Sequence, residues 1–154
     1  MKKIFKISAL LFLASLISVV SCTKDKTSFD SELFKGATIS DDAKSFYTDY
    51  LTVLEKHNKN LRDVKTADEY AKAITIFSED LQALGIKFTA LKKSMPDIEQ
   101  EPKTISEAYD KKMAEVSKEL MEYNMKFISY MKEPLVIDAQ NKLLDAKNSW
   151  DVTE

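Results

Sequence analysis

The sequence predicts an all-α protein, an up-down bundle of three to four long helices that follows a cleaved signal peptide and a flexible tether. Hydrophobic residues make up 44% of the 154 residues. A disordered chain carries fewer, because it cannot bury enough apolar surface to offset its conformational entropy. Two glycines and three prolines are too few for the turns of an all-β fold. From Ser40 onward, apolar residues recur at the three- and four-residue steps of an amphipathic helix.

Residues 1–21 are expected to be a secretory signal peptide and to take no part in the fold. Three lysines, Lys2, Lys3 and Lys6, precede an apolar stretch of 14 residues at positions 7–20. As a helix this stretch would reach about 21 Å, short of the roughly 30 Å hydrocarbon core of a bilayer. The length therefore favours a signal peptide over a permanent transmembrane anchor.

The end of the apolar stretch carries the most specific motif of the chain. The run Val19-Val20-Ser21-Cys22 resembles the lipobox of bacterial lipoproteins, and Cys22 is the only cysteine. The resemblance implies cleavage by signal peptidase II between Ser21 and Cys22, diacylglycerol on the Cys22 thiol and acylation of the new amine. Thr23 after the cysteine is similar to the lipoproteins that enteric bacteria sort to the outer membrane. We therefore expect a protein of the bacterial cell envelope, anchored by lipid, on the outer membrane.

Residues 22–39 are expected to form the lipidated N-terminus and a tether, since they are rich in Lys, Asp, Ser and Thr and show no sustained period. A small apolar cluster of Phe29, Leu33 and Phe34 ends at Gly36. Two interpretations stay open for this cluster: a single helical turn that docks on the bundle, or exposed aromatic residues on a flexible tether.

Residues 40–152 are expected to form the α-helical bundle. Ser40 can cap the first helix, and Thr66 with Glu69 forms a capping box that starts the second. The connection at Lys65 is so short that these helices are either separate or one bent rod. The second helix carries an unbroken heptad seam, typical of helices that pack side by side: Ala67, Tyr70, Ile74, Phe77, Leu81, Leu84, Phe88, Leu91 and Met95.

Residues 96–102 interrupt the helical pattern with two prolines, each of which disfavours helix at the residue before it. A second capping box, Thr104 with Glu107, is expected to start the third helix. Its seam comprises Tyr109, Met113, Val116, Leu120, Tyr123, Phe127 and Tyr130. Pro134 then shifts the phase of the pattern, so that the remaining residues form either a fourth helix or a kinked continuation of the third.

No arrangement of catalytic residues is visible. One histidine, the absence of a G-x-S-x-G motif and two widely spaced glycines give no nucleophile with its base and no phosphate loop. We therefore expect a protein that is not an enzyme and has no cofactor and no metal site. Glu115, Glu119 and Glu122 are interpreted as a solvated helix face interleaved with lysines, because carboxylate metal bundles need two Glu-x-x-His motifs.

Two weaker alternatives involve His57 and the methionines. His57 lies on the apolar face of the first helix, either as a core histidine or as an axial haem ligand with Met113, Met121, Met125 or Met131 opposite. Met121 and Met125 are four residues apart, so they share a helix face and could bind Cu(I) or simply pack.

The aromatic residues are the best candidates for contact with a ligand or partner. Tyrosine has an apolar body and a polar tip and is common at interfaces. The candidate contact residues are His57, Tyr47, Tyr50, Tyr123, Phe127 and Tyr130. The alternative is that the aromatic residues cover the rim of an ordinary bundle core.

The expected function is therefore that of an envelope lipoprotein with a non-enzymatic helical module for binding or structural support. Its expected partners are the membrane, through the N-terminal lipid, and another envelope protein. Loss of residues 1–21 would change the net charge from −2 to −5, which argues against binding nucleic acid. The alternative is a carrier of haem, metal or an apolar molecule within the bundle.

Overall fold

A computed structural model of the chain describes residues 32–94 and 105–150, and all regular elements in these ranges are helical. They are α2 (Asp41–Arg62), α3 (Ala67–Ser94), α4 (Glu107–Lys126), the 3-10 helix η3 (Ile128–Lys132) and α5 (Pro134–Asn148). The predicted all-α bundle is confirmed. The first two helices are separate, and the fourth is a helix of its own that begins at Pro134.

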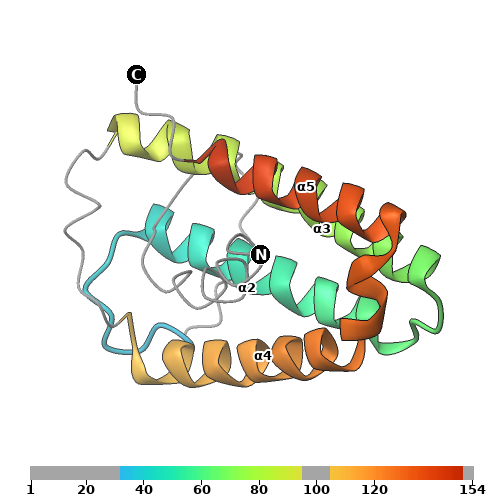
Figure 1. Cartoon of the computed structure of the whole chain (residues 1–154). Helices are drawn as coiled ribbons and strands as arrows, with labels where there is room; N and C mark the ends of the chain where they lie inside the picture. Colours follow the sequence, from blue (N-terminus) through green and yellow to red (C-terminus); the bar gives the residue numbers. More distant parts are fainter. Residues whose placement is uncertain (1–31, 95–104, 151–154) are drawn as a thin grey trace, which may run out of the picture.

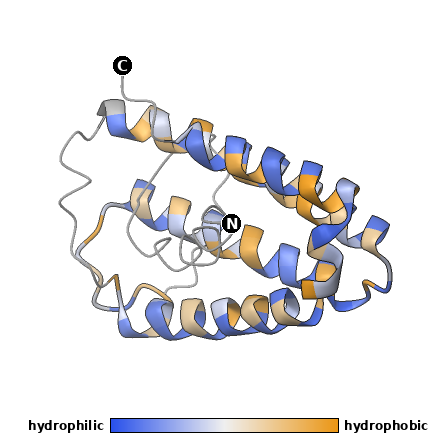
Figure 2. Ribbon diagram, viewed as in Figure 1, coloured by the Kyte–Doolittle hydropathy of each residue, from blue (hydrophilic) through white to orange (hydrophobic). Residues whose placement is uncertain are grey.

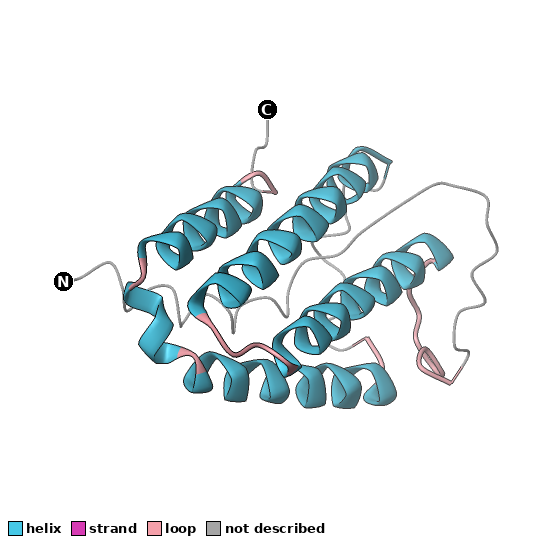
Figure 3. Cartoon of the chain, turned by 90° about the vertical axis from the view of Figure 1, so that its right-hand side faces the viewer, coloured by secondary structure: helices cyan, strands magenta, loops and turns pink. Residues whose placement is uncertain are grey.

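The helices lie side by side in the order α4, α2, α3, α5 (Figures 1 and 3). Along the chain they alternate in direction, so α2 and α4 run one way and α3 and α5 the other (Figure 1). As a result, the main neighbour of α4 is α2 rather than α3, the helix that precedes it in sequence. The contact between α2 and α4 and the contact between α3 and α5 therefore each join two parallel helices.

The helix ends follow from local hydrogen bonds. Ser40 caps α2 by accepting from the backbone N–H of Ala43 at 3.1 Å, as predicted. The capping box before α3 is also confirmed, because the Glu69 N–H donates to Thr66 Oγ1 and the Thr66 N–H to Glu69, each at 3.2 Å. The predicted cap of α4 at Thr104 is wrong: Ser106 is the cap, and its hydroxyl accepts from the backbone N–H of Tyr109 at 3.0 Å.

The last part of the expected tether, residues 32–39, docks on the bundle. Phe34 and Ile39 are buried, and Phe34 stacks on Tyr109 of α4 with ring centroids 5.6 Å apart. The turn ends at Gly36, whose φ of 80° favours glycine. Of the two interpretations of this segment, the docked turn is therefore the correct one for Leu33 and Phe34, while Phe29 lies outside the described residues.

The core consists of two apolar clusters separated by polar side chains. One cluster contains Leu54, Phe77 and Val116, and the other contains Leu61, Ile74 and Leu120 of the same three helices. The buried residues His57 and Asn58 lie on α2 between Leu54 of the first cluster and Leu61 of the second. We call these two residues the polar layer.

Hydrophobic and hydrophilic residues alternate along each helix, as amphipathic helices require (Figure 2). Among the described helices, none is both long and apolar enough to cross a membrane. The expected signal peptide, the lipobox and residues 22–31 of the tether lie outside the described residues.

Candidate functional site

His57 occupies the middle of α2 and is 5% exposed. Its ring stacks on Phe77 of α3, with centroids 4.0 Å apart and an angle of 7° between the planes. Burial lowers the pKa of His57 to about 4, against the opposing effects of the Asp80 carboxylate and of a backbone hydrogen bond at Ala73. The imidazole is therefore neutral at pH 7, and one of its faces is covered.

The methionines named as possible partners of His57 lie in different surroundings, three of them on α4 and Met131 on η3. Met113 packs partly buried against the first apolar cluster, while Met121 and Met125 are 42% and 68% exposed on α4. Within the described residues, no group of three or more His, Cys, Asp or Glu side chains could hold a metal ion. This geometry gives no support to a haem or copper site at these residues.

Tyr47 and Tyr50 belong to the first apolar cluster, near the start of α2. Tyr47 packs edge-on against Tyr109, whose hydroxyl donates to the Tyr47 carbonyl at 3.3 Å. Tyr50 packs against Trp150 with ring centroids 6.4 Å apart. Burial raises the pKa of Tyr50 to about 12, and burial also raises the pKa of Tyr109. Both predicted contact residues therefore serve the core at this level.

Tyr123, Phe127 and Tyr130 lie in the second cluster, around Tyr70 of α3. Phe127 is buried and its ring centroid is 4.9 Å from that of Tyr70. The Tyr130 hydroxyl donates to the carbonyl of Lys65 at 2.8 Å, which fastens η3 to the connection between α2 and α3. The six candidate contact residues are thus divided between two core clusters and the polar layer, and they do not line one groove.

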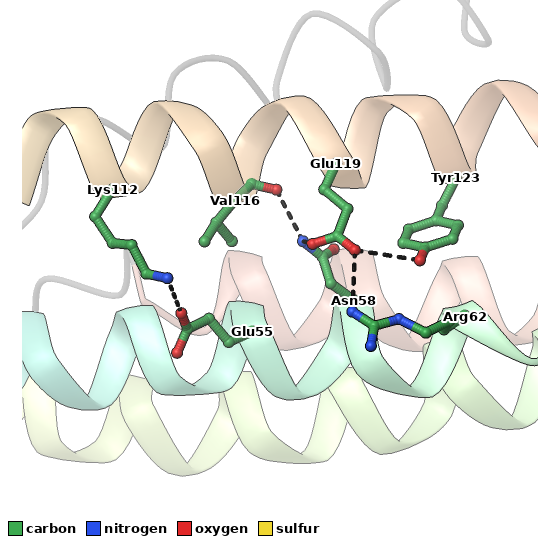
Figure 4. A network of polar contacts seen from close by, with 7 residues as sticks. All are labelled: Glu55, Asn58, Arg62, Lys112, Val116, Glu119 and Tyr123. Carbon is green, nitrogen blue, oxygen red and sulfur yellow. Dashed lines mark hydrogen bonds and ion pairs between the residues drawn. The ribbon is translucent and has the colours of Figure 1, made fainter.

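The most organised polar surface lies between α2 and α4 (Figure 4). We call it the α2–α4 polar seam, and it consists of Glu55, Asn58, Lys59, Arg62, Lys112, Glu115 and Glu119. Its charged side chains and Val116 line an open groove of about 390 Å³. This site was not predicted from the sequence, in which the carboxylates of α4 were interpreted as a solvated helix face.

An ion pair lies at each end of the α2–α4 polar seam. Lys112 Nζ lies 2.7 Å from Glu55, and Arg62 lies 3.5 Å from Glu119 (Figure 4). Tyr123 donates to Glu119 at 3.2 Å. These charges are 38% to 64% exposed, so each pair contributes at most about 1 kcal/mol to stability.

Asn58 forms the buried floor of the α2–α4 polar seam. It is 2% exposed, and its Nδ2 donates to the Val116 carbonyl at 2.9 Å and to Glu119 at 3.2 Å. Its Oδ1 is buried and has no hydrogen-bond partner in the described part of the chain. Because Nδ2 joins α2 to the backbone of α4, this residue ties the position of α4 to that of α2.

The chemistry available at the α2–α4 polar seam is recognition by charge and hydrogen bonding. Three cations and three anions share the groove, so it favours no net charge in a ligand. The spacing of Glu55, Lys59 and Arg62, four and then three residues apart, was the signal that could have revealed a common helix face.

A second open groove, of about 440 Å³, lies between α3 and α5 and is lined by Gln82, Gly85, Ile86, Thr89, Ala90 and Ser149. Ile86 is 70% exposed there.

Comparisons with protein families, with curated proteins and with solved structures gave no significant match.

Proposed function

We propose that this protein is a lipid-anchored component of the bacterial cell envelope whose helical bundle binds another envelope protein or gives structural support, without enzymatic activity. The observation that carries the proposal is the position of Cys22. It is the only cysteine in the chain, and it directly follows an apolar stretch that begins after three lysines. A thiol at this position is the attachment point that signal peptidase II processing requires.

The physical basis of the anchor is the transfer of acyl chains into the bilayer. Each buried methylene contributes about 0.8 kcal/mol, so two or three chains hold a protein stably at the membrane without a spanning helix. Residues 23–31 would then span at most about 30 Å between the lipid and the docked turn at residue 32. Thr23 favours the outer membrane as the destination.

The recognition role rests on the surface chemistry of the described residues. The α2–α4 polar seam offers charged groups of both signs, and the groove beside Ile86 offers apolar surface. Both grooves are open to the surface, so they suit contact with another macromolecule. A small apolar ligand would instead need an enclosed pocket.

The proposal is tested by Cys22→Ser in the bacterial envelope, with Ser18→Ala as the matched control that keeps the thiol. We expect Cys22→Ser to leave the detergent-soluble membrane fraction and to lose incorporation of labelled fatty acid, whereas Ser18→Ala retains both. Intact mass of the wild-type protein should fit a chain that begins at Cys22 and carries acyl groups. A Cys22→Ser protein that stays membrane-anchored with unchanged mobility would refute the lipid anchor.

A further inference from the structure

His57 lies inside the bundle with an incomplete set of hydrogen bonds. Its Nδ1 is buried and has no hydrogen-bond partner in the residues that the structure describes. Its ring lies flat against Phe77, so α3 covers one face of it. The side chain sits in the polar layer, where the core of α2 passes from one apolar cluster to the other.

The two protonation states of this ring fit their surroundings very differently. A neutral imidazole can leave Nδ1 as a lone pair, whereas an imidazolium carries an N–H there that needs an acceptor. A buried donor without an acceptor and a charge removed from water are both unfavourable. Stacking of the cation on Phe77 recovers only part of this loss, because a cation–π contact is weaker than the desolvation of a charge.

The charges around His57 do not change this conclusion. Asp80 of α3 is the charged group that favours the imidazolium, and its carboxylate lies 2.6 Å from Lys56 of α2. On the α4 side, Glu119 pairs with Arg62 of α2 and accepts a hydrogen bond from Asn58. No charge of α5 is among the groups that act on the ring within the described residues.

We propose that proton uptake by His57 opens the contact between α2 and α3, so that the bundle loosens in mild acid. The polar layer thereby makes the stability of the bundle depend on the acidity of the compartment. This acid response is independent of the lipid anchor.

The direction and pH range follow from linkage. Above the usual histidine pKa of about 6.5 both the folded and the unfolded chain hold a neutral ring, and His57 has no effect on the pH dependence. Below that value the unfolded chain takes up the proton first, so stability falls as the pH falls toward the folded pKa of about 4. Between about pH 7 and pH 4.5, this single group would raise the unfolding equilibrium constant about 60-fold.

The test compares urea unfolding of the full chain in mild detergent at about pH 7 and pH 4.5 for the wild type, His57→Leu and Asn58→Leu. Acid protonates carboxylates in all three proteins, so the informative quantity is the difference between them. We expect His57→Leu to lose about 60-fold of the acid-induced increase in the unfolding constant. Asn58→Leu changes the other side of the polar layer and should keep the full acid response, whatever its stability. Equal acid responses in wild type and His57→Leu would overturn the proposal.

The variant Asp80→Asn distinguishes an acid response that comes from His57 from one that comes from the neighbouring ion pair. Because Asp80 favours the imidazolium, its removal should leave the acid response intact or enlarge it. Loss of the response in Asp80→Asn would instead assign it to the Lys56–Asp80 pair and overturn the proposal.

A direct measurement covers the case in which His57→Leu does not fold. The chain has one histidine, so its imidazole resonances are unambiguous in NMR of the wild type. We expect the ring to stay neutral until the bundle loosens, so that its protonation coincides with loss of protected amides in α2 and α3. Titration near pH 6.5 in a bundle that stays folded would also overturn the proposal.

Discussion

A methyl group added at Gly85 tests how α5 and the C-terminal tryptophan are fastened to α3. The Cβ of any other residue at this position would lie 2.4 Å from Trp150 Nε1, closer than real contacts allow. The indole is held from several sides: its N–H donates to the Leu81 carbonyl at 3.0 Å, and its ring stacks on Phe88 with centroids 5.7 Å apart. Gly85→Ala therefore forces Trp150 to move.

Two effects of opposite sign decide the outcome of Gly85→Ala. Alanine in place of glycine inside a helix stabilises by about 1 kcal/mol. Displacing the indole removes a hydrogen bond to Leu81 worth about 1 kcal/mol and part of the packing of a half-buried aromatic ring, for a loss of roughly 2 to 3 kcal/mol. We expect Gly85→Ala to lower the free energy of unfolding by about 1 to 2 kcal/mol.

A double-mutant cycle with Trp150→Ala separates these effects. Without the indole, the added methyl group meets no obstacle, so Gly85→Ala should stabilise the Trp150→Ala protein by about 1 kcal/mol. Urea unfolding followed by far-UV circular dichroism measures all four proteins without relying on tryptophan fluorescence. Destabilisation of the same size in both backgrounds would show that Gly85 is needed for a reason other than Trp150.

Two further predictions concern the cap of α4 and the seam of α3. Ser106→Ala removes the acceptor for the Tyr109 N–H and the donor to the Leu33 carbonyl, so it should lower the free energy of unfolding by about 1 to 2 kcal/mol in urea unfolding. Ser106→Thr keeps a hydroxyl that can both accept and donate, so it should lose less. Leu81→Asp places an unpaired carboxylate at a position that is 4% exposed, so it should abolish the cooperative thermal transition. Leu81→Met should keep this transition. An unchanged melting temperature for Leu81→Asp would show that the heptad seam of α3 faces no core.

The helices that sequence analysis located best are those with long uninterrupted patterns. In α3 every seam position from Tyr70 to Leu91 is buried, because a 28-residue helix with apolar residues at steps of three and four has one strongly preferred buried face. The ends of the helices were less predictable from the sequence. The apolar seam of the third helix was expected to run on to Tyr130, but α4 ends at Lys126 and the 3-10 helix η3 follows. The hydrogen bond from Tyr130 to the Lys65 carbonyl holds η3 in place, and a bond between such distant residues cannot be predicted from a local pattern.

The positions of the candidate contact residues could not be derived from periodicity. A seam shows that Tyr47 or Phe127 faces another element, but it does not show which element, or whether the contact is core, rim or groove. The α2–α4 polar seam was missed for the same reason. Lys112 and Glu55 are 57 positions apart, and only the packing of α4 on α2 brings them within 2.7 Å.

The choice of neighbour for α4 has a physical explanation in the α2–α4 polar seam. The apolar residues of α4 could pack against other apolar faces at little difference in free energy, because hydrophobic burial is not directional. Asn58 is selective, since its buried Nδ2 needs the Val116 carbonyl and the Glu119 carboxylate at the distances seen here. A buried donor without a partner costs about 1 to 3 kcal/mol, which is enough to exclude most alternative positions.

Charge order along the two parallel helices selects the register in the same way. In the observed register Glu55 faces Lys112, and Lys59 and Glu115 share the groove between the two ion pairs. Sliding α4 by one turn in one direction would place Glu115 opposite Glu55, and sliding it in the other direction would place Lys112 opposite Lys59. Each slide therefore creates a like-charge contact and also separates Asn58 from its acceptors. The surface that looked like a solvated face in the sequence is thus the feature that sets where α4 lies on α2.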